Sequence, residues 1–175
     1  MTFTERFKSI AKKLDAVCGV IDRFVQFSLI FFIASIFIFL MLQVVMRYVI
    51  RTPLVWVEEI TSFTLAYLVM WACSTLVRKW QHIRVDTFVN AMPNKIQLII
   101  FAFMNILVIY ISYLFVFAGY SLALLGEFDV SASGFFNLYW PRMALVSGGV
   151  LIIIQAFNNI VLSASGGAEY MLRSK

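Results

Sequence analysis

This sequence is poor in the residues that enzymes and redox proteins depend on. Its 175 residues include one histidine, two cysteines and three prolines, and Asp, Glu, Lys and Arg together make up 13% of the chain. A single histidine cannot supply the axial ligands of a four-helix haem cytochrome. Cys18 and Cys73 do not form the outer cysteine pairs that a thiol-oxidising membrane enzyme needs. No nucleophile with a base beside it and no metal-ligand cluster is evident. The sequence therefore predicts a protein that is not an enzyme and that has no catalytic residue, metal site or cofactor of its own.

What the sequence does contain is long apolar runs, and 62% of its residues are hydrophobic. Four runs hold no Asp, Glu, Lys, Arg or His, at about residues 24–46, 60–77, 96–125 and 143–164. A helix needs about 20 apolar residues to cross the hydrocarbon core. Because the runs lack the polar and apolar alternation of barrel strands, we expect an all-α integral membrane protein with four transmembrane helices. Without long linkers or repeats, residues 1–175 should form a single membrane domain.

The N-terminal residues show a different pattern. Residues 3–22 repeat apolar side chains at spacings of three and four, while Arg6, Lys8, Lys12 and Lys13 fill the other face. This is typical of an amphipathic interfacial helix that lies among the lipid headgroups. A helix that covers the bundle would show the same pattern, so both interpretations are open. We expect no cleaved signal peptide, because the first apolar run exceeds the usual h-region of ~7–15 residues.

Basic residues concentrate on one side of the predicted membrane. They lie mostly before residue 24, in the connection 78–95 and in the C-terminal tail, and only Arg47, Arg51 and Arg142 fall on the other side. The positive-inside rule then predicts that both termini are cytoplasmic. This orientation explains the formal net charge of +5. No basic patch interleaved with aromatics indicates nucleic-acid binding, so the charge points to membrane lipids as partners.

The first outer connection, residues 47–59, is short and rich in charged and aromatic side chains. Its length forces the first two spans into an antiparallel hairpin. Tyr48 and Trp56 suit the aromatic belt at a membrane surface. Thr52 and Pro53 favour the start of the second helix, as an N-cap and a first helical residue.

The same connection carries the acidic pair Glu58 and Glu59. One interpretation is a hairpin end closed by a salt bridge from Arg47 to one of them. Adjacent helical residues point about 100° apart, so both carboxylates cannot face Arg47. At least one is then available for a partner protein or an ion pathway.

The second connection contains Arg78, His82 and Asp86. If this segment is helical, His82 and Asp86 lie four residues apart and can form an imidazole–carboxylate hydrogen bond. The segment offers too few ligands for a metal site. We expect a structural lock between helix and loop.

The outer loop 126–141 combines the acidic residues Glu127 and Asp129 with a run of aromatics. Aromatics at this depth favour membrane anchoring, although they could also dock a partner. Arg142 follows at the start of the last helix, where the dipole disfavours a cation. We therefore expect an acidic or phosphate partner for Arg142.

Polar residues inside the spans are candidate contacts with a partner or within the bundle, and the sequence leaves both open. A small-residue stretch at 147–149 allows close helix approach in either case. The polar residues are Gln43, Asn105, Ser112, Gln155, Asn158 and Asn159.

Taken together, these motifs resemble the small membrane subunit of tripartite ATP-independent periplasmic (TRAP) transporters. The resemblance covers the first three spans and their connections, and within the family the sequence is most similar to sialic-acid members. One departure is Ala72-Cys73, where the family pattern has a glycine. The matching segments are Arg47-Tyr48, Trp56-Val57-Glu58-Glu59, Arg78, His82-Ile83-Arg84-Val85-Asp86 and Pro93.

The resemblance implies a non-catalytic subunit in a bacterial inner membrane. Its partners would be a large multi-span elevator subunit, which carries the solute and sodium sites, and a periplasmic binding protein that delivers a carboxylate solute. This chain would brace the static scaffold and help to dock the binding protein. The alternative is a self-sufficient small exporter that uses Glu58 and Glu59. The interface candidates are Arg47, Tyr48, Trp56, Glu58, Glu59, Arg78, His82, Asp86, Glu127, Asp129 and Arg142.

Overall fold

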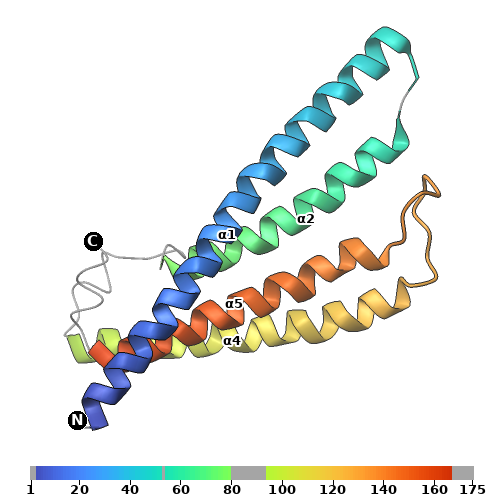
Figure 1. The fold of residues 1–175 in the computed structure, drawn as a ribbon. Coiled ribbons are helices and arrows are strands. Elements are labelled where there is room, and N and C mark those ends of the chain that lie inside the picture. Colours follow the sequence, from blue (N-terminus) through green and yellow to red (C-terminus); the bar gives the residue numbers. More distant parts are fainter. Residues whose placement is uncertain (1–2, 53, 80–93, 167–175) are drawn as a thin grey trace.

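The computed structural model describes residues 3–52, 54–79 and 94–166. Each helix runs antiparallel to the helix before it in the chain (Figure 1). Within the described residues, β pairing is limited to one isolated bridge between Val130 and Asn137. The elements in order are α1 (Phe3–Val45), the π-helical turn η1 (Met46–Ile50), α2 (Val55–Arg78), α4 (Asn94–Leu125) and α5 (Tyr139–Gly166).

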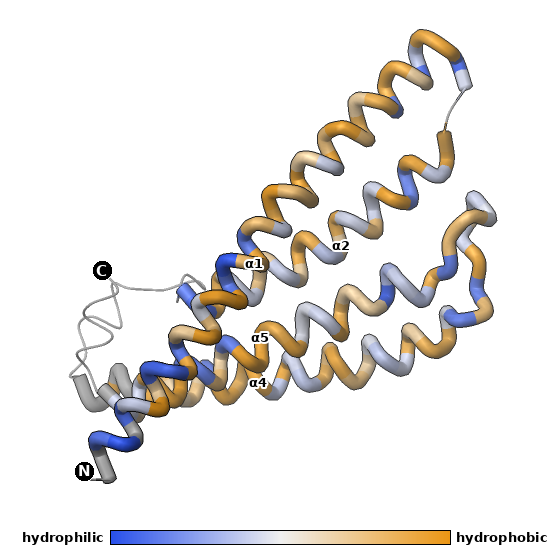
Figure 2. The backbone as a smooth tube through the Cα atoms, viewed as in Figure 1, coloured by the Kyte–Doolittle hydropathy of each residue, from blue (hydrophilic) through white to orange (hydrophobic). Residues whose placement is uncertain are grey.

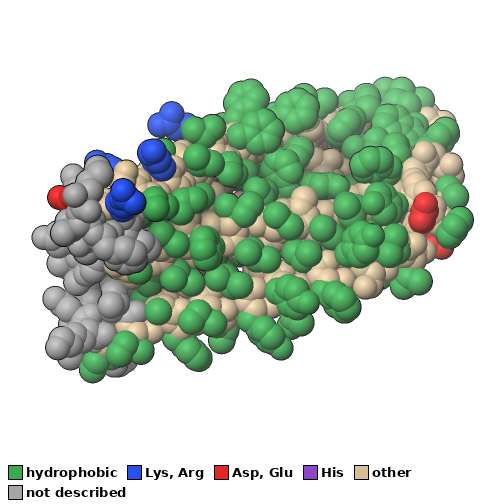
Figure 3. Space-filling view, turned by 60° about the horizontal axis from the view of Figure 1, so that its bottom comes forward, with side chains coloured by type: hydrophobic (Ala, Val, Ile, Leu, Met, Phe, Trp, Pro, Cys, Tyr) green, Lys and Arg blue, Asp and Glu red, His purple; other side chains and the backbone are tan. Residues whose placement is uncertain are grey.

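Among the described residues, four helices are long and apolar enough to cross a membrane, which confirms the predicted all-α membrane fold. Hydrophobic residues dominate the length of each helix (Figure 2). A space-filling view shows them covering the middle of the molecule, with basic side chains gathered toward one end (Figure 3). By length and composition, the candidate spans lie within Lys8–Ile50, Val55–Arg78, Ile99–Leu125 and Tyr139–Ser165.

Helix α1 is uninterrupted, where the sequence predicted an amphipathic helix at 3–22 and a separate span at 24–46. Nothing at that junction stops a helix, because Asp22 and Arg23 are neither glycine nor proline. At 1.5 Å per residue the 43 residues of α1 extend about 65 Å, roughly twice the thickness of the hydrocarbon core. The N-terminal part also packs on α5, as the interpretation of a covering helix requires.

The hairpin between α1 and α2 differs in detail from the prediction. Arg51 adopts a left-handed conformation (φ 59°) and ends η1. The Thr52 N–H donates to the Met46 carbonyl at 3.2 Å, so Thr52 closes the first helix and does not cap the second. Helix α2 begins later, at Val55, after Leu54, which makes no side-chain cap bond.

Helix α5 is the centre of the bundle and packs against α4, α2 and α1. Its glycines allow the closest approaches. A Cβ at Gly148 would lie 2.5 Å from the Met70 Cβ on α2, and one at Gly149 would lie 3.1 Å from the Ser112 carbonyl oxygen on α4. The small-residue stretch 147–149 therefore serves packing inside this bundle.

Polar side chains within the spans also bond inside the chain. Asn105 is buried and donates to the Phe101 carbonyl at 2.8 Å. Asn159 is buried and donates to the Val77 carbonyl at 2.9 Å, which ties α5 to the last turn of α2. Of the two interpretations that the sequence left open, packing within the bundle is the one that these contacts support.

Candidate functional sites at the two ends of the bundle

Most of the remaining polar contacts lie at the two ends of the bundle. We call the end with residue 51 and the α4–α5 connection (126–138) the Glu59 end. We call the opposite end, where α2 finishes beside the N-terminal part of α1, the Arg78 end. Both ends are visible in Figure 1.

Arg78 is the last residue of α2 and joins three helices. Its Nη2 lies 2.9 Å from Asp15 Oδ1 and its Nε lies 3.8 Å from Asp22 Oδ2, both on α1. Its Nη1 donates to Gln155 Oε1 on α5 at 3.2 Å. The Arg78 side chain is only 18% exposed. The planar fork of a guanidinium can serve several acceptors at once, which the point charge of lysine cannot do as well.

Neighbouring groups complete this network. Asn158 on α5 donates to Asp15 Oδ1 at 3.2 Å, and Gln26 donates to Asp22 Oδ2 at 2.6 Å. Gly19 makes room for the guanidinium, because a Cβ there would lie 3.3 Å from Arg78 Nη2. Buried charges are tolerated when they are paired and hydrogen-bonded. The network therefore locks the N-terminal part of α1 onto α2 and α5.

Glu59 fastens the outer loop to the first turns of α2. Its carboxylate accepts hydrogen bonds from the Ser131 hydroxyl at 2.7 Å and from the Ser133 backbone N–H at 2.9 Å. The Ser133 hydroxyl donates to it as well. Bonds to an ionised acceptor are stronger than neutral ones. Glu59 thus binds the loop of its own chain. The sequence had predicted that at least one of Glu58 and Glu59 is available for a partner protein or an ion pathway.

The α4–α5 loop adopts a defined turn around the hydrogen bonds to Glu59. The Ser131 N–H donates to the Phe136 carbonyl at 2.8 Å, and the turn between them passes through Gly134 at φ 76°, a conformation that favours glycine. The Asn137 side chain then accepts from the Tyr139 N–H at 2.8 Å and caps the start of α5. The Phe136 ring packs edge-on against Phe63 of α2.

Arg142 has the acidic partner that the sequence predicted. Its Nη2 lies 3.3 Å from Asp129 Oδ2, and its Nη1 donates to the Leu122 carbonyl at 3.0 Å. That carbonyl belongs to the last turn of α4, where the helix dipole favours a cation. Although Arg142 lies in the first turn of α5, it is stabilised by the C-terminus of α4.

The predicted salt bridge across the first hairpin is absent from the described residues, because Arg47 pairs with neither Glu58 nor Glu59. Glu58 instead accepts a hydrogen bond from Gln43 on α1. Arg47 lies in η1, one turn further along the chain than Gln43. Tyr48 beside it is 74% exposed.

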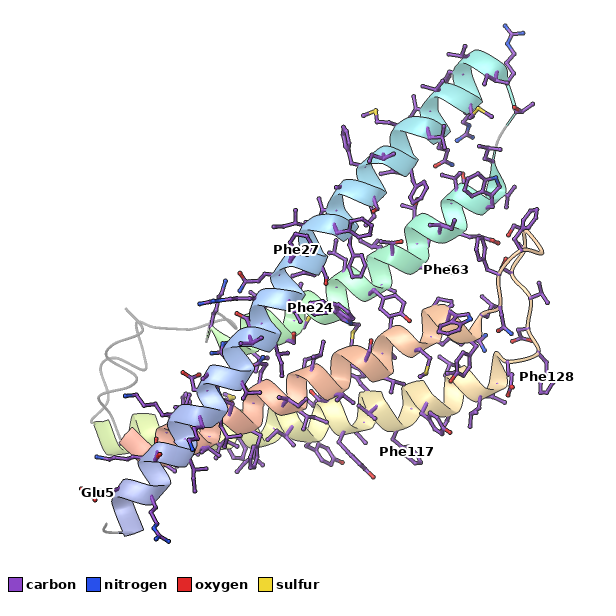
Figure 4. All side chains as sticks on the ribbon, in the orientation of Figure 1. Glu5, Phe24, Phe27, Phe63, Phe117 and Phe128 are labelled. Carbon is purple, nitrogen blue, oxygen red and sulfur yellow. The ribbon has the colours of Figure 1, made fainter. Side chains whose placement is uncertain are left out.

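Several of the site residues predicted from the sequence are wholly or partly exposed to solvent at the Glu59 end. Arg47, Glu127 and Asp129 are exposed, and Trp56 is half-buried. Phe128, between the two acids, is 90% exposed and points away from the bundle (Figure 4). His82 and Asp86 lie outside the described residues.

Sequence reasoning missed the partners of Arg78 and Glu59. Asp15 and Asp22 are seven residues apart and share a face of a predominantly basic segment, which was a usable signal. Ser131 and Ser133 carry no comparable signal. No group of three or more His, Cys, Asp or Glu that could hold a metal ion occurs in the part of the chain that the structure describes.

These features define a class: a four-helix integral membrane protein whose charged groups fasten its own helices and loop together at two ends. The model of the DctQ component of tripartite ATP-independent periplasmic transporters matches residues 36–166, and the chain belongs to this family. That family is a membrane component of these transporters.

Curated relatives agree with this assignment. The chain is 30% identical over 137 residues to the sialic acid TRAP transporter permease protein SiaT of Haemophilus influenzae, covering 78% of this chain and 22% of that protein. It is 29% identical over 76 residues to the C4-dicarboxylate TRAP transporter small permease protein DctQ of Vibrio cholerae, covering 43% and 33%. It is 21% identical over 118 residues to the sialic acid TRAP transporter small permease protein SiaQ of Vibrio cholerae, covering 67% and 68%. The matched region thus spans a third or less of the first two relatives.

Proposed function

We propose that this chain is the scaffold subunit of a sodium-coupled, binding-protein-dependent importer in a bacterial inner membrane, with both termini in the cytoplasm. A large elevator-type subunit carries the solute and sodium sites, and this chain braces the static part of that subunit. The solute is a carboxylate. Sialic acid is the first candidate, because two of the three relatives are named for it.

The observation that carries this proposal is the absence of ionisable side chains from the middle of the described spans. Between the Arg78 end and the Glu59 end, the described spans contain no Asp, Glu, Lys, Arg or His. An ion or solute pathway at membrane depth usually depends on such groups. The length of SiaT is a second support, since the matched region is only 22% of that permease. The transport step would then belong to a part of the transporter outside this four-helix bundle.

The Glu59 end is the candidate docking surface for the periplasmic binding protein. Glu59 fixes the loop through Ser131 and Ser133, so the exposed Glu127, Phe128 and Asp129 are presented on a held backbone. A preorganised loop loses less entropy on binding than a free one. Membrane anchoring by Phe128 is the competing role.

A self-sufficient exporter that uses Glu58 and Glu59 is less well supported. Glu58 accepts from Gln43 and Glu59 accepts from two serines, and both lie near the start of α2 and not at its centre. An exporter predicts that Glu58→Gln with Glu59→Gln abolishes transport while assembly stays intact. The scaffold proposal predicts that this double variant loosens the outer loop and reduces assembly and uptake together.

Co-purification and uptake test the proposal directly. A tagged chain is expressed with the large subunit and the binding protein, and the labelled carboxylate inside the cells is counted. We expect the large subunit to co-purify, and uptake to be lost when this chain is omitted. Trp56→Ala and Glu59→Gln should each weaken co-purification or uptake. Full uptake without this chain would overturn the proposal.

A further inference from the structure

One face of α1 is exposed along the whole helix and carries apolar residues at heptad spacing. The large side chains on this face are 49% to 72% exposed, and the small residue Ala34 among them is also exposed. Phe24 and Phe27, which belong to it, are labelled in Figure 4. We call this face the α1 seam, and it consists of Ile10, Val17, Phe24, Phe31, Ile38 and Val45 with Val20, Phe27, Ala34 and Met41 between them.

The bundle uses a different face of α1. Ala11, Cys18 and Val25 are 1%, 4% and 2% exposed and pack toward the rest of the chain. The seam points away from these residues and has no partner within the described chain. Apolar residues repeated every seven positions favour a second helix that packs along the first at about 20°, as in left-handed helix pairs.

Lipid alone does not account for the full length of the seam. The charge-free part of α1 begins at Phe24, directly after Asp22 and Arg23. Ile10 lies 14 residues before Phe24, which is about 21 Å along a helix axis. Ile10 and Val17 are 56% and 59% exposed there, beyond the apolar stretch that the hydrocarbon core would cover.

Two basic residues on the α1 seam indicate which kind of helix can pack against it. Arg6 and Lys13 take the positions that Val20 and Phe27 occupy further along, and both are exposed. A second copy of this chain in the same orientation would place these basic residues against each other, which is unfavourable. An acidic helix would complement them.

We propose that the α1 seam docks a long membrane-spanning helix of the large transporter subunit, one that continues beyond the membrane surface and presents acidic side chains to Arg6 and Lys13. This inference rests on the proposed function, because it names the surface by which the scaffold subunit holds its partner.

Site-specific photo-crosslinking tests the seam in cells that express this chain with the large subunit. A photoreactive phenylalanine analogue is placed at position 17 or 20 on the seam, and at position 12 as an exposed control off the seam. We expect positions 17 and 20 to cross-link to the large subunit, at a helix with Asp or Glu at that depth when mapped by mass spectrometry. Position 12 should give little product.

Charge reversal supplies a matched pair of variants. Lys13→Glu should lower the cross-link yield from position 17 about fivefold, the equivalent of one surface ion pair. Lys12→Glu, one residue away and off the seam, should leave the yield unchanged. Cross-links only to a second copy or only to lipid, or equal effects of the two variants, would overturn the inference.

Co-purification in the same cells separates the two levels of the argument. If the large subunit co-purifies with the wild-type chain but the seam positions do not cross-link to it, the seam inference fails and the proposed function stands. If the large subunit does not co-purify at all, the proposed function fails, and the seam inference fails with it.

Discussion

Replacing Arg78 by methionine should destabilise the bundle by about 3 kcal/mol. The guanidinium lies 2.9 Å from Asp15 and 3.8 Å from Asp22, and methionine would leave both carboxylates without a counter-charge. Removing one partner of a buried pair costs about 3–5 kcal/mol. The side chains of Arg78 and Asp15 are 18% and 36% exposed, so solvent screening places the loss at the lower end of that range.

The assay is thermal unfolding of the purified protein in detergent. For a chain of this size, about 3 kcal/mol corresponds to a fall in Tm of roughly 6–12 °C. Lys79→Met is the matched control, because Lys79 is adjacent and exposed and its side chain has no ion pair or hydrogen bond in the described residues. Adding Asp15→Asn and Asp22→Asn to Arg78→Met should restore part of the loss, since no uncompensated charge remains. An Arg78→Met protein as stable as Lys79→Met would refute the reasoning.

Three further predictions follow from the other contacts. Gly148→Ala should lower the free energy of unfolding by about 1–3 kcal/mol, because the added Cβ would lie 2.5 Å from the Met70 Cβ. Alanine normally stabilises a helix relative to glycine, so a gain in stability would contradict the close packing. Glu59→Gln should speed proteolysis within residues 126–138, because the serine hydrogen bonds weaken; a cleavage rate equal to wild type would mean that Glu59 does not hold the loop. Arg142→Gln should cost about 1 kcal/mol in thermal unfolding, since the exposed Asp129 limits the strength of the ion pair. Arg51→Gln is its control, because Arg51 is exposed and forms no ion pair with any residue that the structure describes; equal losses would remove the role assigned to Arg142.

The membrane fold was predictable because it depends on segment length and the absence of charge. A stretch such as 96–125 has no other stable solution in lipid than a helix. The break expected near Asp22 was not there, because a change from amphipathic to uniformly apolar sequence alters what surrounds a helix and does not end it. Only residues such as Gly or Pro, or a competing cap, end a helix at a defined position.

The sites were predictable only in part. The acidic partner of Arg142 followed from helix electrostatics, although its identity as Asp129 did not. The partners of Arg78 required knowledge of how the N-terminal part of α1 packs on α5, which is a tertiary property. The hairpin salt bridge failed for a local reason: Glu58 accepts its hydrogen bond from Gln43, which lies one turn before Arg47, and Arg47 belongs to η1.

Solute uptake into sealed liposomes tests the central claim most directly. The purified chain is reconstituted alone, or together with the large subunit, and labelled carboxylate uptake is measured with the binding protein outside and an inward sodium gradient. The account predicts no uptake above empty liposomes for the chain alone and gradient-dependent uptake for the pair. Uptake by the chain alone would contradict it.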